Sequence, residues 1–217
     1  MDATYGGATL TDLYEAILAP GQTGRVEIPD CSRDQIPGLC VRLGLRTGVE
    51  VGVYQGKHMR HWLRAGLHMT AVDPWSSRPE YPMRVGRQEE IYQDAMRRLA
   101  RYTDRLTVLR TTSMDAVQTF APGSLDVVYI DGHHGFRYIA EDVWEWSQRV
   151  RSGGIVAGHD YHNHWRGPHD PDTVHVGYVI DAFTKAMRIP VWFVLGRAEG
   201  REGERLDRWR SWMWIKP

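Results

Sequence analysis

Short apolar runs alternate with amphipathic stretches along most of the chain. Runs of four to seven residues rich in apolar and β-branched side chains predict buried strands at 47–53, 68–72, 106–109, 125–130, 155–158, 191–195 and 209–215. Apolar residues at helical spacing predict helices at 11–18, 57–63, 88–102, 114–120, 138–151 and 176–187. This alternation predicts an α/β protein with a seven-stranded, mostly parallel sheet, helices on both faces and a C-terminal β-hairpin.

The first 45 residues differ from the rest of the chain. After the helix at 11–18, residues 21–44 are rich in proline, glycine and charge, and they predict an irregular segment that covers part of the first strand or the site. Residues 46–217 carry the regular alternation. With 217 residues, 42% of them hydrophobic, the chain can bury one substantial core, so we expect one structural domain overall.

The stretch RTGVEVGVYQGKHMRHW, residues 46–62, joins the first strand of this pattern to its helix. Gly52 can adopt a backbone conformation that other residues resist, and Gly56 lets the helix begin close to a ligand. Glu50 places a carboxylate at the end of the strand. The arrangement favours a cradle for a small polar cofactor, and an ordinary strand-to-helix loop is the alternative.

Polar side chains follow several of the later strands. Asp73 comes about 20 residues after the glycine turn, where Rossmann-like sheets bind a ribose; a turn aspartate before Pro74 is the alternative. The strands at 125–130 and 155–158 are followed by Asp131, His133, His134, His159 and Asp160. Because parallel strands end at the same edge of a sheet, we expect these side chains in one crevice.

Other candidate site residues lie in loops. Thr111, Thr112 and Ser113 follow the strand at 106–109 and either meet a cofactor base or cap the next helix, with capping the expectation for each one singly. The loops at 76–86 and 161–175 are long enough to form walls of a substrate pocket. Seven of the ten histidines lie between positions 133 and 175, which indicates a functional surface.

Charge and cysteine content narrow the function. Lys plus Arg equals Asp plus Glu at 27 each, which argues against nucleic acid or an anionic membrane as partner and favours a small polar molecule. The arginines of the helix at 88–102 predict a solvated face. Cys31 and Cys40 lack metal-site spacing and predict reduced thiols. We find no export signal or membrane-spanning run, so we expect a cytoplasmic protein.

Four segments carry a resemblance to a known family: VEVGVYQGK (49–57), AVDPW (71–75), LDVVYIDGHH (125–134) and RSGGIVAGHDY (151–161). They span about half the chain, and their order and spacing resemble class I S-adenosylmethionine-dependent methyltransferases. More narrowly, the chain resembles small-molecule O-methyltransferases that include macrocin-type and cephalosporin-hydroxylase-like proteins. The resemblance implies a Rossmann-like sheet and methylation of a hydroxyl on a sugar, phenolic or natural-product type of molecule.

The resemblance assigns S-adenosylmethionine to residues at the edge of the sheet: Glu50, Gly52, Tyr54, Gly56, Asp73, Trp75, Ser113, Asp131 and His133. The glycine turn would receive the amino acid part of the cofactor, with Glu50 near its amino group. Asp73 would bind the ribose hydroxyls and Ser113 would lie near the adenine. Asp131 and His133 would face the reacting methyl group.

Some relatives also hold a divalent ion with acids at the ends of the fourth and fifth strands. Here those residues are Asp131 and Asp160, and His159 stands where relatives often carry a second acid. One carboxylate fewer weakens a site for Mg²⁺, so a softer ion or no metal is the alternative. The acceptor hydroxyl must lose a proton, and either a bound ion beside Asp131 or a histidine base, His134 or His159, would assist.

Two other functions stay open. The chain could be an accessory protein that keeps the fold without turnover and uses its tryptophan-rich tail at 209–214, although strand packing or a homodimer surface is the expectation for that tail. It could also be an iron-dependent hydroxylase in which His159 and Asp160 bind the metal with His162 or His164. In that case the glycine turn would have no clear ligand.

Overall fold

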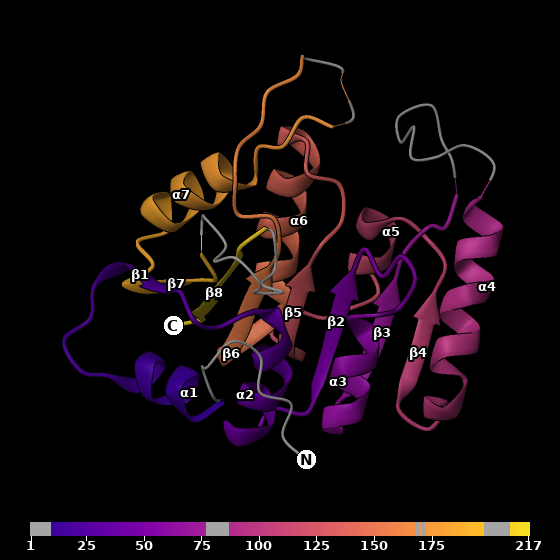
Figure 1. Ribbon diagram of the computed structural model, residues 1–217, viewed down its shortest axis with the longest axis horizontal. Helices are drawn as coiled ribbons and strands as arrows, with labels where there is room; N and C mark the ends of the chain where they lie inside the picture. Colours follow the sequence, from indigo (N-terminus) through magenta and orange to yellow (C-terminus); the bar gives the residue numbers. More distant parts are fainter. Residues whose placement is uncertain (1–9, 77–86, 168–169, 171, 198–208) are drawn as a thin grey trace.

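A central sheet organises the computed structural model, which describes residues 10–76, 87–167, 170, 172–197 and 209–217 (Figure 1). Within this part of the chain the sheet has eight strands: β1 (Gly24–Ile28), β2 (Thr47–Val51), β3 (His68–Val72), β4 (Leu106–Leu109), β5 (Leu125–Ile130), β6 (Val150–Gly158), β7 (Val191–Leu195) and β8 (Ser211–Ile215). The helices are α1 (Leu10–Leu18), α2 (Ile36–Arg42), α3 (Met59–Ala65), α4 (Gln88–Leu99), α5 (Ser113–Val117), α6 (Phe136–Arg149) and α7 (Val176–Ala186). Two short 3₁₀ helices, η1 (Arg33–Gln35) and η2 (Ala100–Tyr102), precede α2 and follow α4.

The order of the strands places a switch point at the centre of the sheet. The order is β1-β7-β8-β6-β5-β2-β3-β4, and every pair is parallel except the two that β8 makes. From β2 the chain moves outward through β3 to β4 and then returns to β5 on the other side of β2. Open α/β sheets bind ligands beyond the carboxyl ends of the strands at such a point.

Two hydrophobic cores lie on opposite faces of the sheet. One contains buried side chains of α1 to α4, including Leu13 and Trp62, and the other contains side chains of α5 to α7, including Trp146. Neighbouring residues of one strand point to opposite faces, so Tyr129 joins the first core and Val128 the second. The predicted α/β architecture with helices on both faces is confirmed, and β3, β4 and β5 have the predicted bounds.

The sheet has one strand more than predicted, because residues 21–44 are not irregular. They contain β1 and α2, and β1 pairs in parallel with β7 at the edge of the sheet. The signal of β1 is weak because only Val26 and Ile28 of its five residues are partly buried. Pro37 suggested a break, but it lies in the first turn of α2, where its missing N–H costs no helical hydrogen bond.

The C-terminal end completes the sheet. The predicted hairpin is confirmed, since β7 and β8 pair antiparallel. Trp212 and Trp214 are 0% and 1% exposed and stack with ring centroids 5.3 Å apart, so they pack within the protein. Apart from Ser76, the loop predicted at 76–86 as a substrate wall lies outside the described residues. In the part of the chain that the structure describes, no helix is long and apolar enough to cross a membrane.

Candidate active site

The glycine turn lies directly beyond β2 and touches the end of β5. Gly52 has φ +86°, and a Cβ at this position would lie 2.0 Å from the backbone oxygen of Asp131. The chain itself therefore requires glycine here, whether or not a ligand binds. Gly56 has φ +70°, and its N–H donates to the oxygen of Val53 at 2.8 Å, which closes the turn.

Asp73 holds the glycine turn in place. Its two carboxylate oxygens accept hydrogen bonds from the backbone N–H groups of Tyr54 and Trp75, each at 2.8 Å. The Trp75 indole, which is 1% exposed, donates to the oxygen of Tyr54 at 2.8 Å. Burial raises the pKa of Asp73, although the two N–H groups oppose the shift. Trp75 thus supports the turn from the core, and Asp73 joins the turn to the end of β3.

A buried acid and a buried histidine lie behind the turn. Glu50 is 1% exposed and His58 is 7% exposed, and His58 Nδ1 lies 3.6 Å from Glu50 Oε2. Within the described part of the chain, Glu50 Oε2 and His58 Nε2 are both buried without a hydrogen-bond partner. Burial raises the pKa of Glu50, with His58 opposing the shift. Our sequence reasoning missed His58, although its place between Gly56 and α3 could have indicated it.

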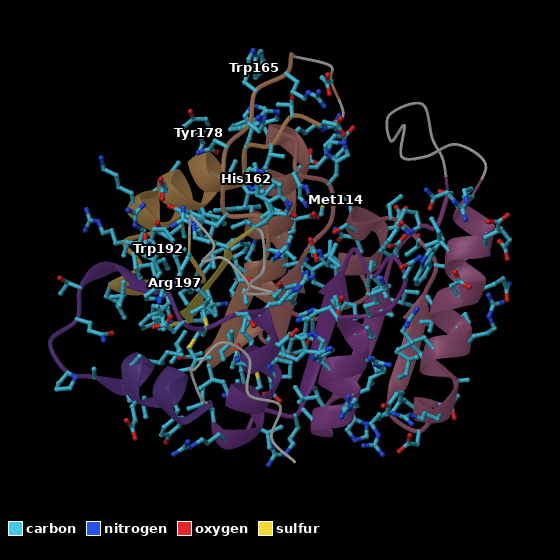
Figure 2. The ribbon with its side chains drawn as sticks, in the orientation of Figure 1. Met114, His162, Trp165, Tyr178, Trp192 and Arg197 are labelled. Carbon is cyan, nitrogen blue, oxygen red and sulfur yellow. The ribbon has the colours of Figure 1, made fainter. Side chains whose placement is uncertain are left out.

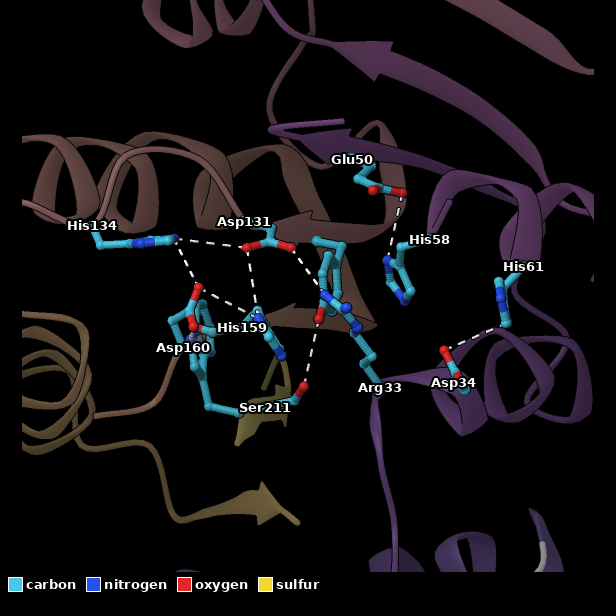
Figure 3. Close-up of polar contacts among 12 residues, drawn as sticks. Arg33, Asp34, Glu50, His58, His61, Asp131, His134, His159, Asp160 and Ser211 are labelled. Atoms are coloured by element: carbon cyan, nitrogen blue, oxygen red, sulfur yellow. Dashed lines mark hydrogen bonds and ion pairs between the residues drawn. The ribbon is translucent and has the colours of Figure 1, made fainter. Parts of the chain in front are cut away.

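Four polar side chains meet beyond β5 and β6 (Figure 3). His134 Nε2 lies 3.0 Å from Asp160 Oδ2 and 3.7 Å from Asp131 Oδ1. His159 approaches the same carboxylates through Nδ1, at 3.4 Å from Asp160 and 3.8 Å from Asp131. Asp160 has φ +55°, a conformation that aspartate tolerates better than most residues. The polar residues predicted at the two strand ends are therefore together.

Opposite charges stabilise one another in this cluster. Burial alone would lower the pKa of His134, but hydrogen bonding to Asp131 and Asp160 outweighs it and raises the pKa to about 10. Burial alone would raise the pKa of Asp160, but His134 and His159 hold it well below its usual range. The pKa of His159 is also raised, because the effect of its two carboxylate neighbours outweighs the effect of burial. In this arrangement Asp160 is charged and is balanced by the two imidazole groups beside it.

Arg33 is a site residue that sequence reasoning missed. It lies in η1, and its Nη1 donates to Asp131 Oδ2 at 3.2 Å. A capping box between Ser32 and Gln35 fixes η1, and Asp34 lies 3.5 Å from His61 Nδ1 of α3. The segment was predicted to be irregular, and Arg33 and Asp131 are 98 residues apart, so no local pattern could have paired them.

Ser113 faces a second buried acid. Its hydroxyl donates to Asp142 of α6 and accepts a hydrogen bond from Trp146 Nε1 at 2.8 Å. Asp142 is 5% exposed, and burial raises its pKa to about 7, although the Ser113 hydroxyl opposes the shift. The neighbouring Thr112 caps α5 by accepting from the N–H of Asp115, as expected from the sequence. Sequence reasoning missed Asp142, an acid among the apolar positions of an amphipathic helix.

His133 lies beside the polar cluster and has partners of its own. Its Nδ1 accepts from the N–H of Gly135 at 3.0 Å, and its ring lies 4.2 Å from that of Tyr138. Burial and the neighbouring His134 lower the pKa of His133 to about 4. His133 is therefore neutral at physiological pH, whereas the adjacent His134 is not.

The donor atoms that could hold a metal ion come from Asp131, His134 and Asp160. These three atoms all lie within 4.8 Å of one another. The sequence predicted His159 as the third ligand, and its Nδ1 lies 3.8 and 3.4 Å from Asp131 and Asp160. The structure adds His134, which the sequence had named only as a base. Among the described residues, no such group contains two imidazoles. In the following loop His162 stacks on Trp209, and Trp165 lies 65% exposed at the outer end of the loop (Figure 2).

The sequence matches one family model, described as a methyltransferase domain, over residues 49–161. This chain belongs to the methyltransferase-domain family. The match runs from β2 to the end of β6 and includes every site residue that the sequence predicted, whereas Arg33 lies outside it. No curated protein matches the sequence.

Solved methyltransferases share the fold. The O-methyltransferase TomG of Streptomyces achromogenes, involved in tomaymycin synthesis and solved with S-adenosylmethionine, has a TM-score of 0.59 at 15% identity, with coverage of 100% of this chain and 91% of TomG. An O-methyltransferase of Bacillus cereus solved with S-adenosylhomocysteine has a TM-score of 0.57 at 15% identity, with coverage of 95% and 89%. The resemblance to class I S-adenosylmethionine-dependent methyltransferases is confirmed; the narrower macrocin-type and cephalosporin-hydroxylase-like group stays a prediction.

Proposed function

We propose that this methyltransferase transfers the methyl group of S-adenosylmethionine to a hydroxyl oxygen of a small polar molecule. The observation that carries the proposal is the contact between Gly52 and Asp131. It places the turn expected to hold the cofactor directly against the cluster of Asp131, His134 and Asp160. A methyl group presented by the turn would therefore face polar groups able to act on an acceptor hydroxyl. The methyl acceptors would be sugars, phenols or natural products of similar polarity.

The residues around the turn fit the cofactor. A buried polar atom without a partner is costly, so the two such atoms behind the turn call for a ligand. Glu50 Oε2 can accept from an ammonium group, and His58 Nε2 can donate to a carboxylate, which together match an amino acid end. Asp73 keeps a second lone pair on each oxygen after binding Tyr54 and Trp75, so it can still accept from ribose hydroxyls.

Methyl transfer from a sulfonium requires alignment of the acceptor oxygen, the methyl carbon and the sulfur, which can contribute roughly 7 kcal/mol or more. The acceptor must also lose its proton, and water would take it up because His134 already carries one. With a pKa near 10, His134 is protonated at neutral pH, and its charge would stabilise the oxygen anion that forms. Arg33 neutralises Asp131, so that this carboxylate does not repel the same anion.

A divalent ion is compatible with the same three side chains. Asp131, His134 and Asp160 would hold it, and two oxygens with one imidazole nitrogen suit an ion softer than Mg²⁺ better than Mg²⁺ itself. Such an ion would lower the pKa of a bound hydroxyl. His134 would then have to bind in its neutral form, so ion binding would release its proton.

The first experiment is a calorimetric titration with S-adenosylhomocysteine, once with Mg²⁺ and once with EDTA. We expect binding on the order of micromolar in both, and a difference between them would indicate an ion at the cluster. The second is methyl transfer from labelled S-adenosylmethionine to a panel of phenols and sugars by Asp160→Asn. Asparagine tolerates the positive φ, so the variant removes charge without adding strain.

Asp160→Asn should lose turnover and keep its affinity for S-adenosylhomocysteine within about twofold, because its carboxylate contacts the acceptor side of the site. The matched control is Asp104→Asn, which removes an exposed carboxylate before β4, at the opposite end of the strands, and should stay active. Full activity of Asp160→Asn would refute the role of the cluster. Absence of S-adenosylhomocysteine binding in the native protein would refute the assignment of the turn.

A further inference from the structure

A hollow of about 550 Å³ lies on the outer side of α3 and α4, apart from the cluster at β5 and β6. Its lining residues are Arg60, Asp94, Arg97, Arg98, Ala100 and Arg101. Arg60 belongs to the first turn of α3, and its N–H donates to the oxygen of Gly56 at 3.2 Å. The others belong to α4 and η2. Two helices that are distant in the sequence therefore bring four guanidinium groups around one hollow.

Positive charge in the hollow exceeds negative charge by three. Asp94 is the one acid in the lining, and it pairs with Arg97. Arg98 uses its Nε to donate to the oxygen of Gln55, and Arg101 donates to the Tyr102 hydroxyl at 2.8 Å. The whole chain has equal numbers of acidic and basic residues, so this is a local concentration of charge. Like charges at such close range repel, and an anion would relieve the repulsion.

Arg60 supplies an independent sign of a ligand. Its Nε is buried and has no hydrogen-bond partner within the described part of the chain. A buried N–H of a charged group that lacks an acceptor costs more folding free energy than a buried N–H of a neutral group that lacks one. The structure thus has an unmet donor on a residue that lines the hollow.

We propose that this hollow binds a small anion that carries two phosphoryl groups. Arginine forks match phosphate oxygens in pairs, which makes phosphoryl groups the preferred partner of several arginines in one place. Three uncompensated charges exceed what a single carboxylate balances, and a diphosphate matches them. A nucleic acid is not the ligand we choose, because its backbone needs an extended basic track and the chain as a whole is neutral. Three arginines of the helix predicted at 88–102 thus gain a role beyond that of a solvated face.

The test is a calorimetric titration of the full chain with sodium pyrophosphate at about 50 mM salt, where screening is weak. We expect one site with a dissociation constant on the order of 10 µM that weakens as salt is raised. The double variant Arg97→Gln/Arg101→Gln removes two exposed guanidinium groups and should weaken binding at least about tenfold. Arg60→Lys keeps the charge but removes the fork and should weaken binding to a smaller extent.

The matched control is Arg64→Gln, which removes an exposed arginine of α3 that does not line the hollow. It should bind pyrophosphate as the native protein does. A second titration with ADP distinguishes the source of the ligand: equal affinity indicates recognition of the diphosphate alone, and at least about tenfold tighter binding indicates a nucleotide. Absence of pyrophosphate binding, or equal loss in Arg64→Gln and the double variant, would overturn the proposal.

Discussion

Asp142 should make the native protein less stable at neutral pH than a variant without its carboxyl group. The side chain is buried in α6, and its hydrogen-bond donor on the Ser113 side is a neutral hydroxyl. Asp142→Asn keeps the shape of the side chain and can still accept from the Ser113 hydroxyl. The substitution removes the free-energy cost that the native protein bears at neutral pH, where it must either ionise a buried carboxyl group or keep that group protonated above its ordinary pKa.

The size of the effect follows from the shifted pKa. Raising it from 3.8 to about 7 corresponds to roughly 4 kcal/mol between the two protonation states. Because the pKa is raised in the folded state, the unfolded chain releases its proton first as pH increases. The contribution of Asp142 to the free energy of unfolding is therefore greatest below pH 3.8 and is lost progressively up to about pH 7. The asparagine variant lacks this loss, so its advantage over the native protein should grow by about 2–3 kcal/mol between pH 5 and 8.

Urea unfolding followed by tryptophan fluorescence at several pH values, in EDTA, measures the difference. The amide of the asparagine costs about 1 kcal/mol wherever its N–H groups lack partners, but this cost does not depend on pH. Glu90→Gln is the control, because it removes an exposed carboxyl of α4 that pairs with Arg87 and should change stability by about 0.5 kcal/mol or less. A difference between Asp142→Asn and the native protein that stays constant with pH would refute the reasoning.

Two further substitutions test the turn and the cluster. Gly52→Ala should reduce the free energy of unfolding by at least about 3 kcal/mol, because its Cβ would collide with the backbone of Asp131. The control is Gly66→Ala, where φ is +95° and no atom lies within 4 Å, and it should reduce the free energy of unfolding by about 1–2 kcal/mol. Equal reductions in urea unfolding would contradict the collision. Arg33→Gln should lower kcat/KM about tenfold or more, because it removes the guanidinium group that pairs with Asp131. Arg33→Lys keeps the positive charge and should retain part of the native kcat/KM. An unchanged kcat/KM in Arg33→Gln would show that the ion pair has no part in turnover.

The strands and helices of the central fold could be predicted from the sequence because their signals are local. The strand Leu125–Ile130 is a run of six residues, five of them apolar, closed by Asp131 and Gly132, and its bounds were predicted correctly. The helix α6 shows apolar residues at helical spacing, and only its ends differ from the prediction. In both cases the burial that fixes the element is visible within about ten residues of sequence.

The candidate site was predictable in part for the same reason. A polar residue that follows an apolar run lies at the carboxyl end of a strand, and parallel strands place these ends together, so Asp131 and Asp160 were expected side by side. Their distances to individual imidazoles depend on backbone angles that no pattern reports, such as φ +55° at Asp160. The place of His134 beside both carboxylates was therefore not available from the sequence.

The sequence by itself determined the alternation of strands and helices, the position of the glycine turn and the edge of the sheet at which the polar residues gather. Only the tertiary structure decided that Gly52 is required by the passage of β5, that Arg33 reaches Asp131 from the N-terminal segment, and that arginines of α3 and α4 share one hollow. The physical reason is that periodicity is a property of neighbouring residues. Contacts between distant residues depend on strand order and on the few angles that set each turn.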